Sequence, residues 1–480
     1  MIKTGQTTLS SYLSIYDILI PSNHEFRRLK ALVDFQFVYD ELVENYCLDN
    51  GRPAYEPIQM FKYLYLKLRY KLSDRDLIAR CQMDMACKFF LDLSPEDDVI
   101  DASSLSKFRT QRIQDMRLID LLIQKTLEIA IREGVLKSKR IILDATHSSS
   151  RFNQKSPSEI LKSQSKALRK AIYQNDPELA ELLPQKPEET ASFEAQKSYC
   201  EQLIETVGQD DLANLGIIRE QRNLLEEKLS DIAYAQSFDS DARVGYKAVD
   251  KPFVGYKNHI ALSEERLITA VVVTSGEKAD GNYLQALHQA SMKNGMNVEG
   301  IVGDRAYSWK DNIEYCEANH LELFSRLNSV ISEGHDTKGF TYVKDADTFI
   351  CPAGEAPIRQ TLTGKRKNSD TKVLTCFYDI EKCQVCPLRE GCYKTGSQSK
   401  SHSRSIPSNT HQKQKIFEDS VYFQGVISER YKIEAKNSEL KQRHGLDRAY
   451  SRGLFAMTLQ TAMTVFVVNM KRIMTLIDEK

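Results

Sequence analysis

The stretch KRIILDATHSS, residues 139–149, indicates a buried β-strand that carries a carboxylate close to its end. Three consecutive apolar residues precede Asp144, and a short run of this kind is typical of a strand covered on both faces. The stretch NVEGIVGDRAYS, residues 297–308, repeats the pattern with Asp304. Open α/β sheets place their active sites at the carboxyl ends of strands. The two aspartates are therefore candidates for one shared site.

A third carboxylate lies in ISERYKIEAKNSELKQRHG, residues 427–445, whose composition and final His-Gly predict a helix. Arg430, Glu434 and Lys441 are spaced by four and then seven residues. At about 100° per residue they lie within roughly 40° of one another on the helix. A solvated salt-bridge ladder is the usual explanation of such a stripe. A catalytic glutamate is the alternative that the two aspartates favour.

Asp144, Asp304 and Glu434 together predict a site for a pair of divalent cations. Magnesium prefers carboxylate oxygens and keeps water molecules that a substrate can replace. Two ions about 4 Å apart can activate an attacking oxygen and stabilise the leaving oxygen of a phosphodiester. We therefore expect two Mg²⁺ or Mn²⁺ ions at these residues.

Three short blocks resemble the catalytic blocks of DDE transposases of bacterial insertion sequences: D-A-T at 144, D-R-A-Y at 304 and R-x3-E-x6-K at 430. The third block is similar to that of the branch with the Y-R-E-K motif, Y-x2-R-x3-E-x6-K, and Ile427 occupies the position of its tyrosine. The run KLSDRDLIARCQMDMACKFFLDL, residues 71–93, followed by DASSLSKFR, residues 101–109, resembles the InsH-type N-terminal domain of these enzymes.

The resemblance implies a transposase that binds the terminal inverted repeats of an insertion sequence and catalyses metal-dependent DNA strand cleavage and strand transfer. In such an enzyme Asp144, Asp304 and Glu434 are the catalytic residues and the metal ligands. Arg430 and Lys441 would then contact DNA phosphates.

Tyr307, three residues after Asp304, would pack against a sugar or a base of the DNA, and packing in the protein core is an equal alternative. The implied partner is double-stranded DNA, as element ends and as target. Work on the two ends of one element also implies a homodimer on the DNA.

Two other functions stay open. A two-metal DNA nuclease would have the same fold and site but would not join strands. A non-catalytic zinc-containing DNA-binding protein would have no such chemistry, although the presence of all three carboxylates argues against it. The helical N-terminal module and the basic insertions favour binding at specific DNA ends over indiscriminate cutting.

The composition bounds these functions. The chain has 480 residues, 41% hydrophobic and 28% charged, with a formal net charge of zero, so cations for DNA must be concentrated locally. We expect no membrane partner, because the most apolar segment, residues 454–468, is interrupted by polar residues and predicts a core helix. No secretory signal opens the sequence, which favours a cytoplasmic, nucleoid-associated protein.

The pattern of strands and helices predicts an α/β chain (an α+β mixed sheet) with a ribonuclease-H-like catalytic core, preceded by an all-helical N-terminal domain. We expect a loose lead at residues 1–20, a helix-turn-helix-like DNA-end-binding domain at 21–135 and the catalytic domain at 136–480. The catalytic domain carries a polar helical insertion at 151–235 and a cysteine-rich and basic insertion at 325–415.

The role of the helical insertion is open between a solvated hairpin and a contact with DNA or a second subunit. Residues 393–415 contain no Asp or Glu and are rich in Lys, Arg and Ser. That composition predicts a segment that is mobile, lies along DNA or serves as a flexible linker.

The cysteine-rich insertion contains a zinc-like spacing. Cys383-x2-Cys386 is followed by Cys392 and preceded by Cys351, and Cys376 is a fifth candidate. Four thiolates at these spacings are compatible with a closed structural zinc site, and free structural thiols or redox work are the alternatives. Thiolates do not suit magnesium, so this would be distinct from the catalytic metal site.

Overall fold

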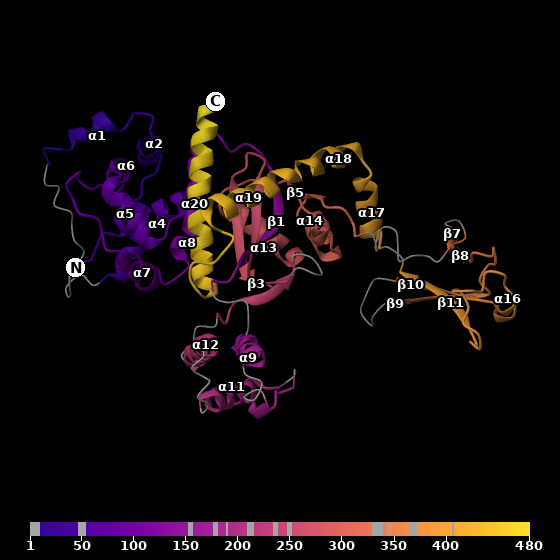
Figure 1. Ribbon diagram of the computed structural model, residues 1–480. Helices are drawn as coiled ribbons and strands as arrows, with labels where there is room; N and C mark the ends of the chain where they lie inside the picture. Colours follow the sequence, from indigo (N-terminus) through magenta and orange to yellow (C-terminus); the bar gives the residue numbers. More distant parts are fainter. Residues whose placement is uncertain are drawn as a thin grey trace.

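The computed structural model describes most of the chain. The described residues are 10–46, 54–151, 157–175, 181–188, 191–208, 216–233, 239–246, 252–328, 339–343, 346, 348–364, 372–405 and 408–480. They form an N-terminal helical region, a central mixed sheet, a helical insertion and a small β-rich lobe (Figure 1).

The central sheet has six strands. They are β1 (Arg140–Ser149), β2 (Arg243–Tyr246), β3 (Pro252–Ser263), β4 (Ile268–Ser275), β5 (Gly300–Val302) and β6 (Glu322–Phe324). The order is β2-β3-β1-β5-β6, and β4 also pairs with β3. The β1–β3 and β3–β4 pairs are antiparallel, whereas β5 and β6 run parallel to β1. The predicted mixed sheet is present, and β3 and β4 form an antiparallel hairpin within it.

Each face of the sheet packs against its own set of helices. On one face lie α13 (Leu284–Lys293) and α14 (Lys310–Ala318), over a core that includes Leu143 and Ile301. On the other face lie α19 (Tyr431–His444) and α20 (Leu454–Asp478), over a core that includes Ile142 and Val302. The alternation of neighbouring residues between the two cores is the period-2 pattern of a strand covered on both sides.

The N-terminal region is helical, as predicted. Its helices are α1 (Ser14–Leu19), α2 (Glu25–Leu32), α3 (Gln36–Leu42), α4 (Pro57–Tyr70), α5 (Asp74–Met83), α6 (Met85–Phe90), α7 (Ala102–Gln111) and α8 (Arg117–Arg132). Local signals set several boundaries: Pro57 occupies the first turn of α4, and the Ser73 hydroxyl caps α5 by accepting from the Asp76 N–H at 3.2 Å.

The loose lead expected at residues 1–20 is partly folded. Residues 14–19 form α1, whose Tyr16 is buried, and residues 1–9 lie outside the described part. Within residues 27–46, extended backbone at Val33 separates α2 from α3. Val33 and Phe35 are both buried, so core packing outweighs the local helix pattern there.

Helix α20 is the central helix of the molecule and lies between the N-terminal helices and the sheet (Figure 1). By length and composition alone it could cross a membrane, but 72% of its most apolar window is buried inside the protein. Its side chains contribute to the cores on both sides, for example Phe466 to the helical region and Val465 to the sheet. The prediction of a core helix is confirmed.

Asn469 of α20 joins three elements through a fully buried amide. Its Oδ1 accepts from the Ile268 N–H at 2.9 Å, and its Nδ2 donates to the Ile268 carbonyl at 2.8 Å and to the Thr126 hydroxyl at 2.9 Å. The amide thus satisfies both backbone groups at the start of β4.

Replacing Asn469 by Ala is expected to lower the free energy of unfolding by about 2 kcal/mol, because it leaves buried backbone groups without partners. Urea titration checks this value against that of an Asn319→Ala variant, whose amide bonds only within its own helix end. Equal stability of the two variants would contradict the role given to Asn469.

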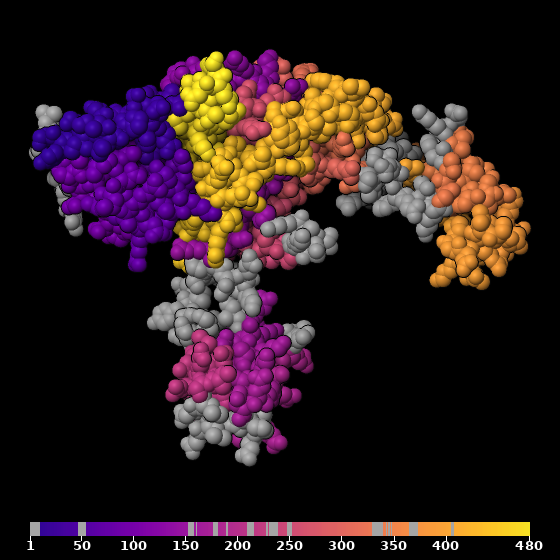
Figure 2. All heavy atoms as spheres, turned by 45° about the horizontal axis from the view of Figure 1, so that its top comes forward, coloured from indigo at the N-terminus to yellow at the C-terminus, as the bar shows by residue number. Residues whose placement is uncertain are grey.

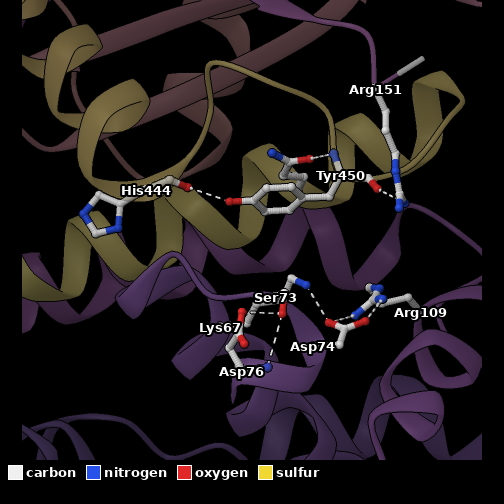
Figure 3. A network of polar contacts seen from close by, with 9 residues as sticks. Lys67, Ser73, Asp74, Asp76, Arg109, Arg151, His444 and Tyr450 are labelled. Carbon is white, nitrogen blue, oxygen red and sulfur yellow. Dashed lines mark hydrogen bonds and ion pairs between the residues drawn. The ribbon is translucent and has the colours of Figure 1, made fainter. Parts of the chain in front are cut away.

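The far end of α19 is anchored to the N-terminal region, and the Tyr450 hydroxyl also points to the carbonyl of its last residue, His444 (Figure 3). His444, its last residue, donates from Nδ1 to the Leu68 carbonyl of α4 at 3.0 Å. Gly445 then ends the helix with a φ of +71°, and a Cβ there would lie 2.0 Å from the Tyr450 hydroxyl oxygen. Position 445 therefore needs glycine both for its left-handed backbone and for the close approach of the tyrosine.

Below Tyr450 in Figure 3, an ion cluster holds α4, α5 and α7 together. The Asp74 carboxylate accepts from Lys67 at 2.5 Å and from both terminal nitrogens of Arg109 at 3.1 and 2.6 Å. Burial favours the neutral acid, but the bonds from Arg109 and Lys67 outweigh burial and lower the pKa of Asp74. The charged cluster thus stabilises the packing of α4, α5 and α7 against one another.

The two insertions project from the central body (Figures 1 and 2). The helical insertion has its own small core and consists of α9 (Pro157–Asn175), α11 (Phe193–Gly208) and α12 (Gly216–Ala233). The β-rich lobe consists of β7 (Thr341–Val343), β8 (Thr348–Ile350), β9 (Arg359–Gly364), β10 (Lys372–Tyr378), α16 (Ile380–Gln384) and β11 (Lys400–Ser405). We call the described residues of 339–405 the cysteine lobe.

The basic, Ser-rich stretch is folded in its described part. Residues 400–405 form β11, which pairs antiparallel with β10, and a helix, α17 (Asn409–Glu418), follows. Helix α18 (Val421–Ile427) then leads to α19. The prediction of a mobile segment was wrong here, because pairing with β10 supplies backbone hydrogen bonds that the composition does not reveal.

Candidate active site

Asp144 lies on β1, and Asp304 lies in the turn just after the neighbouring strand β5. The parallel β1–β5 register aligns Arg140 with Gly300 and Ile142 with Val302, where the pairing ends. Asp144 and Asp304 each follow the last paired residue of their segment by two positions, and the charge of Asp304 acts on Asp144. The strand pairing therefore brings together two carboxylates that are 160 residues apart in the sequence (304 − 144 = 160).

Asp144 contacts residues at the start of and within α19. Its side chain is 19% exposed, its Oδ2 accepts from Asn437 Nδ2 at 2.9 Å, and its Oδ1 lies 3.8 Å from the Arg430 guanidinium. Burial raises the pKa of the Asp144 carboxyl to about 6; Arg430 opposes the rise, and the charge of Asp304 adds to it. The effect of Asp304 is that of a like charge close by.

Glu434 reaches this site through Arg430. Its carboxylate lies 3.1 Å from Arg430 Nη1, and its side chain is 59% exposed. Arg430 thus bridges Glu434 and Asp144, in agreement with the predicted stripe on the helix. Arg430, which the resemblance assigns to DNA phosphates, lies between these two carboxylates.

Asp304 is fixed by its own turn. Its Oδ1 accepts from the Ala306 N–H at 2.9 Å and caps the short helix η4 (Arg305–Tyr307). Its backbone carbonyl accepts from the Ser325 hydroxyl just beyond β6. The carboxylate is therefore positioned by local backbone geometry, whereas that of Glu434 is carried on a long side chain.

Tyr307 is fully buried and belongs to the core under the sheet. This placement fits the core-packing alternative rather than contact with a DNA base. Burial, and then the charges of Asp280, Asp144 and Asp304, raise the pKa of Tyr307 far above its ordinary value, so its hydroxyl stays protonated. In the described part of the chain this hydroxyl has no hydrogen-bond partner.

A fourth acidic residue, Asp280, was missed by the sequence analysis. It opens the short helix η3 (Asp280–Tyr283) after β4, lies 2.9 Å from Lys257 Nζ and 3.9 Å from His259 Nδ1, and adds to the raised pKa of Asp144. Burial lowers the pKa of His259 to about 4, although Asp280 opposes that shift, so the ring is neutral at pH 7. Lys257 is therefore the cation that balances Asp280.

Asn312 ties the loops of Asp280 and Asp304 together. Its Nδ2 donates to the Gly281 carbonyl at 2.8 Å and to the Tyr307 carbonyl at 3.1 Å. Gly281 lies so close to this turn that a Cβ would be 2.2 Å from the Ala306 carbonyl oxygen. The two loops are thus held in tight contact.

Lys441 lies beside β1, with its Nζ 3.3 Å from the nearer ring nitrogen of His147.

Asp239 and Tyr256 form a buried polar contact next to the start of α20. The Tyr256 hydroxyl donates to the Asp239 carboxylate at 2.6 Å, and the same carboxylate accepts from the Gly453 N–H at 3.1 Å.

The carboxylates do not form a closed metal cage. Across the described ranges, no group of three or more His, Cys, Asp or Glu side chains is arranged so that it could hold a metal ion. At this site the reason is that Glu434 is bonded to Arg430 instead of facing the aspartates. The donor set itself suits a hard cation, because Asp144 and Asp304 both present oxygens.

The four predicted zinc ligands do come together. Cys351, Cys383, Cys386 and Cys392 all line one small cavity in the cysteine lobe. Cys376 does not: it is fully buried in the lobe core, where its Sγ lies 3.9 Å from Gln360 Oε1. Each described cysteine is a free thiol.

Two protein families match parts of the chain. The family described as Transposase domain (DUF772) matches residues 14–111, which form the N-terminal helices. The family described as Transposase DDE domain matches residues 350–474, which run from the cysteine lobe to α20. No curated protein matches the chain. The two family matches support a DDE transposase, and the DDE domain implies a ribonuclease-H-like core.

The match to the DDE domain includes Glu434 but neither Asp144 nor Asp304. The two aspartates are therefore assigned from their positions on and after the paired strands β1 and β5, and from the effect of the Asp304 charge on the pKa of Asp144. Asn437, which also lies within the match, was missed because a lone asparagine on a polar helix carries no signal of its contact with Asp144.

Proposed function

We propose that this protein is a transposase of the Y-R-E-K branch. It binds the terminal inverted repeats of an insertion sequence and catalyses cleavage and strand transfer at one site made of Asp144, Asp304 and Glu434. The proposal is supported most strongly by the position of Asp144 on β1 and Asp304 just after the paired strand β5, together with the Arg430 contacts that link Asp144 to Glu434.

The residues of the site have distinct roles in this proposal. The carboxylates of Asp144, Asp304 and Glu434 would hold two Mg²⁺ or Mn²⁺ ions, which activate an attacking oxygen and stabilise a leaving oxygen. Asn437 holds the Asp144 carboxylate in place through its 2.9 Å bond. Arg430 pairs with Glu434 and lies near Asp144, so Glu434 would have to leave Arg430 in order to act as a ligand.

DNA binding is assigned to two features of the chain. Lys441, beside His147 on β1, would contact a phosphate as a point charge. The N-terminal helices, which match a transposase domain, would read the element end as an InsH-type domain does. The enzyme would work as a homodimer on the nucleoid, in the cytoplasm, because one element presents two ends.

The proposal is tested with a labelled duplex that carries an element end, a supercoiled target plasmid and magnesium. We expect cleavage at the end of the element and joining of its 3′ end to the target, with neither product when magnesium is replaced by EDTA. A duplex with a scrambled terminal repeat is the matched substrate control.

The same assay separates the two alternatives. Cutting of either duplex without joined product would favour a two-metal nuclease. End-specific binding without any metal-dependent cleavage would favour a non-catalytic DNA-binding protein. In both cases the transposase proposal fails.

A further inference from the structure

The cysteine lobe brings together four thiols from two separate segments. Cys351 directly follows β8, whereas Cys383 lies in α16, and Cys386 and Cys392 lie in the loop after it. All four line a single cavity of about 30 Å³. A cavity this small, with four thiols among its lining residues, has room for an ion but not for an organic ligand.

We propose that these four thiols bind one structural zinc ion. The proposal concerns the folding of the lobe and does not depend on the function of Asp144, Asp304 and Glu434. Zinc takes four thiolates in a tetrahedron with Zn–S distances of about 2.3 Å.

The backbone around Cys351 is shaped for a thiolate. The Glu355 N–H donates to the Cys351 Sγ at 3.3 Å, and the Gly354 N–H donates to the Cys351 carbonyl at 2.8 Å. Gly354 has a φ of +84°, which lets the chain turn back over the sulfur. A backbone donor aimed at a sulfur stabilises its charged form, which is the form that binds metal.

The second segment is turned in a similar way. The Arg389 N–H donates to the Cys386 carbonyl at 3.2 Å, and the Cys392 N–H donates to the Arg389 carbonyl at 3.0 Å. These turns bring Cys392 back to the cavity that Cys383 and Cys386 line. One segment thus supplies Cys351 to the cavity, and the other supplies Cys383, Cys386 and Cys392.

The lobe needs a cross-link of some kind. Its buried core, within the described residues, consists of Phe340, Phe349, Leu374, Cys376 and Tyr378. Its described strands pair only with one another, so the central sheet gives them no hydrogen bonds. Units of this size with so small a core usually depend on disulfides or a metal. The described cysteines form no disulfide, and four of them line one cavity, which favours a metal.

As they stand, the side chains do not form a closed metal-holding group, as noted above for all described residues. To bind one zinc ion, the four thiols must turn toward a common centre. Each of the four is only partly buried, so rotation about its Cα–Cβ bond is open to it. Cys376, by contrast, is locked in the core of the lobe and serves as an internal control.

The test is the zinc content of the full-length chain, without an affinity tag, purified from zinc-supplemented cells. Elemental analysis is expected to give about one zinc per chain, and the Cys383→Ser, Cys386→Ser double variant is expected to lose it. The Cys376→Ala variant is expected to keep it. Cobalt exchanged into the wild-type chain should show the intense visible and charge-transfer bands of tetrahedral thiolate coordination.

A second measurement covers the case in which the double variant does not fold. Wild-type protein treated with a chelator should become sensitive to protease within residues 339–405, while the central body stays resistant. Purified wild-type protein without zinc that also gives no thiolate bands with cobalt would overturn the proposal. So would a soluble double variant that keeps its full zinc content.

Discussion

Replacing Glu434 by Gln is expected to reduce DNA cleavage by more than about a hundredfold while the protein stays folded. Loss of a group that merely orients a metal ligand costs about 10- to 100-fold, so loss of a ligand itself should cost more. The fold should tolerate the change, because the side chain is 59% exposed and its pair with Arg430 contributes little to stability. The measurement is the single-turnover rate of cleavage of an end-containing duplex in magnesium.

The matched control for this variant is Glu429→Gln. Glu429 lies one turn earlier and pairs with Lys432, away from the aspartates, so its loss should leave the cleavage rate within about twofold. If cleavage survives in Glu434→Gln at the wild-type rate, the catalytic assignment of Glu434 is wrong. If both variants lose activity equally, the loss comes from a general disturbance of this segment and not from the Glu434 carboxylate.

The second large effect is a gain in stability on removing a catalytic charge. Replacing Asp144 by Asn is expected to raise the free energy of unfolding at pH 8, in metal-free buffer, by about 3 kcal/mol. The reason is that burial raises the pKa of Asp144 from 3.8 to about 6, and each unit corresponds to about 1.4 kcal/mol. The same variant should have no cleavage activity.

The sign of the pH dependence follows from proton binding. Between pH 4 and pH 6 the folded protein binds more protons at Asp144 than the unfolded chain does, so wild-type stability falls as pH rises through this window. The advantage of the Asn variant should therefore be absent near pH 4, grow to about pH 6 and stay constant above it. Urea titrations across this range, with Asp419→Asn as an exposed control, measure it. A variant that is less stable than wild type at pH 8 would contradict the buried-charge account.

Some residues of the site can be predicted from the sequence, and others can be found only in the structure. Asp144 and Asp304 are readable because each follows an apolar run, and strand ends in such sheets meet at one edge. Glu434 is readable from its helix and from its spacing to Arg430 and Lys441. Asn437 and Asp280 are not, because their contacts with the site arise only when α19 and η3 are packed against the sheet.

The elements of the fold also differ in whether the sequence predicts them. Helix α20 and the β3–β4 hairpin follow from strong apolar patterns, and both are present. Strand β11 could not be predicted, because its polar sequence is held by pairing with β10 and not by burial of its own side chains. The contact between Arg430 and Asp144 could not be predicted from the sequence either, because these residues are 286 positions apart (430 − 144 = 286).

The most direct test is an anomalous-scattering map from crystals of the protein bound to an element-end duplex and soaked in manganese. We expect two manganese peaks between the Asp144 and Asp304 carboxylates, with the Glu434 carboxylate moved from Arg430 to the nearer ion and metal–oxygen distances of about 2.0–2.3 Å. A map with the DNA in place in which manganese is absent from the aspartates, or in which Glu434 stays paired with Arg430, would contradict a shared site of three carboxylates.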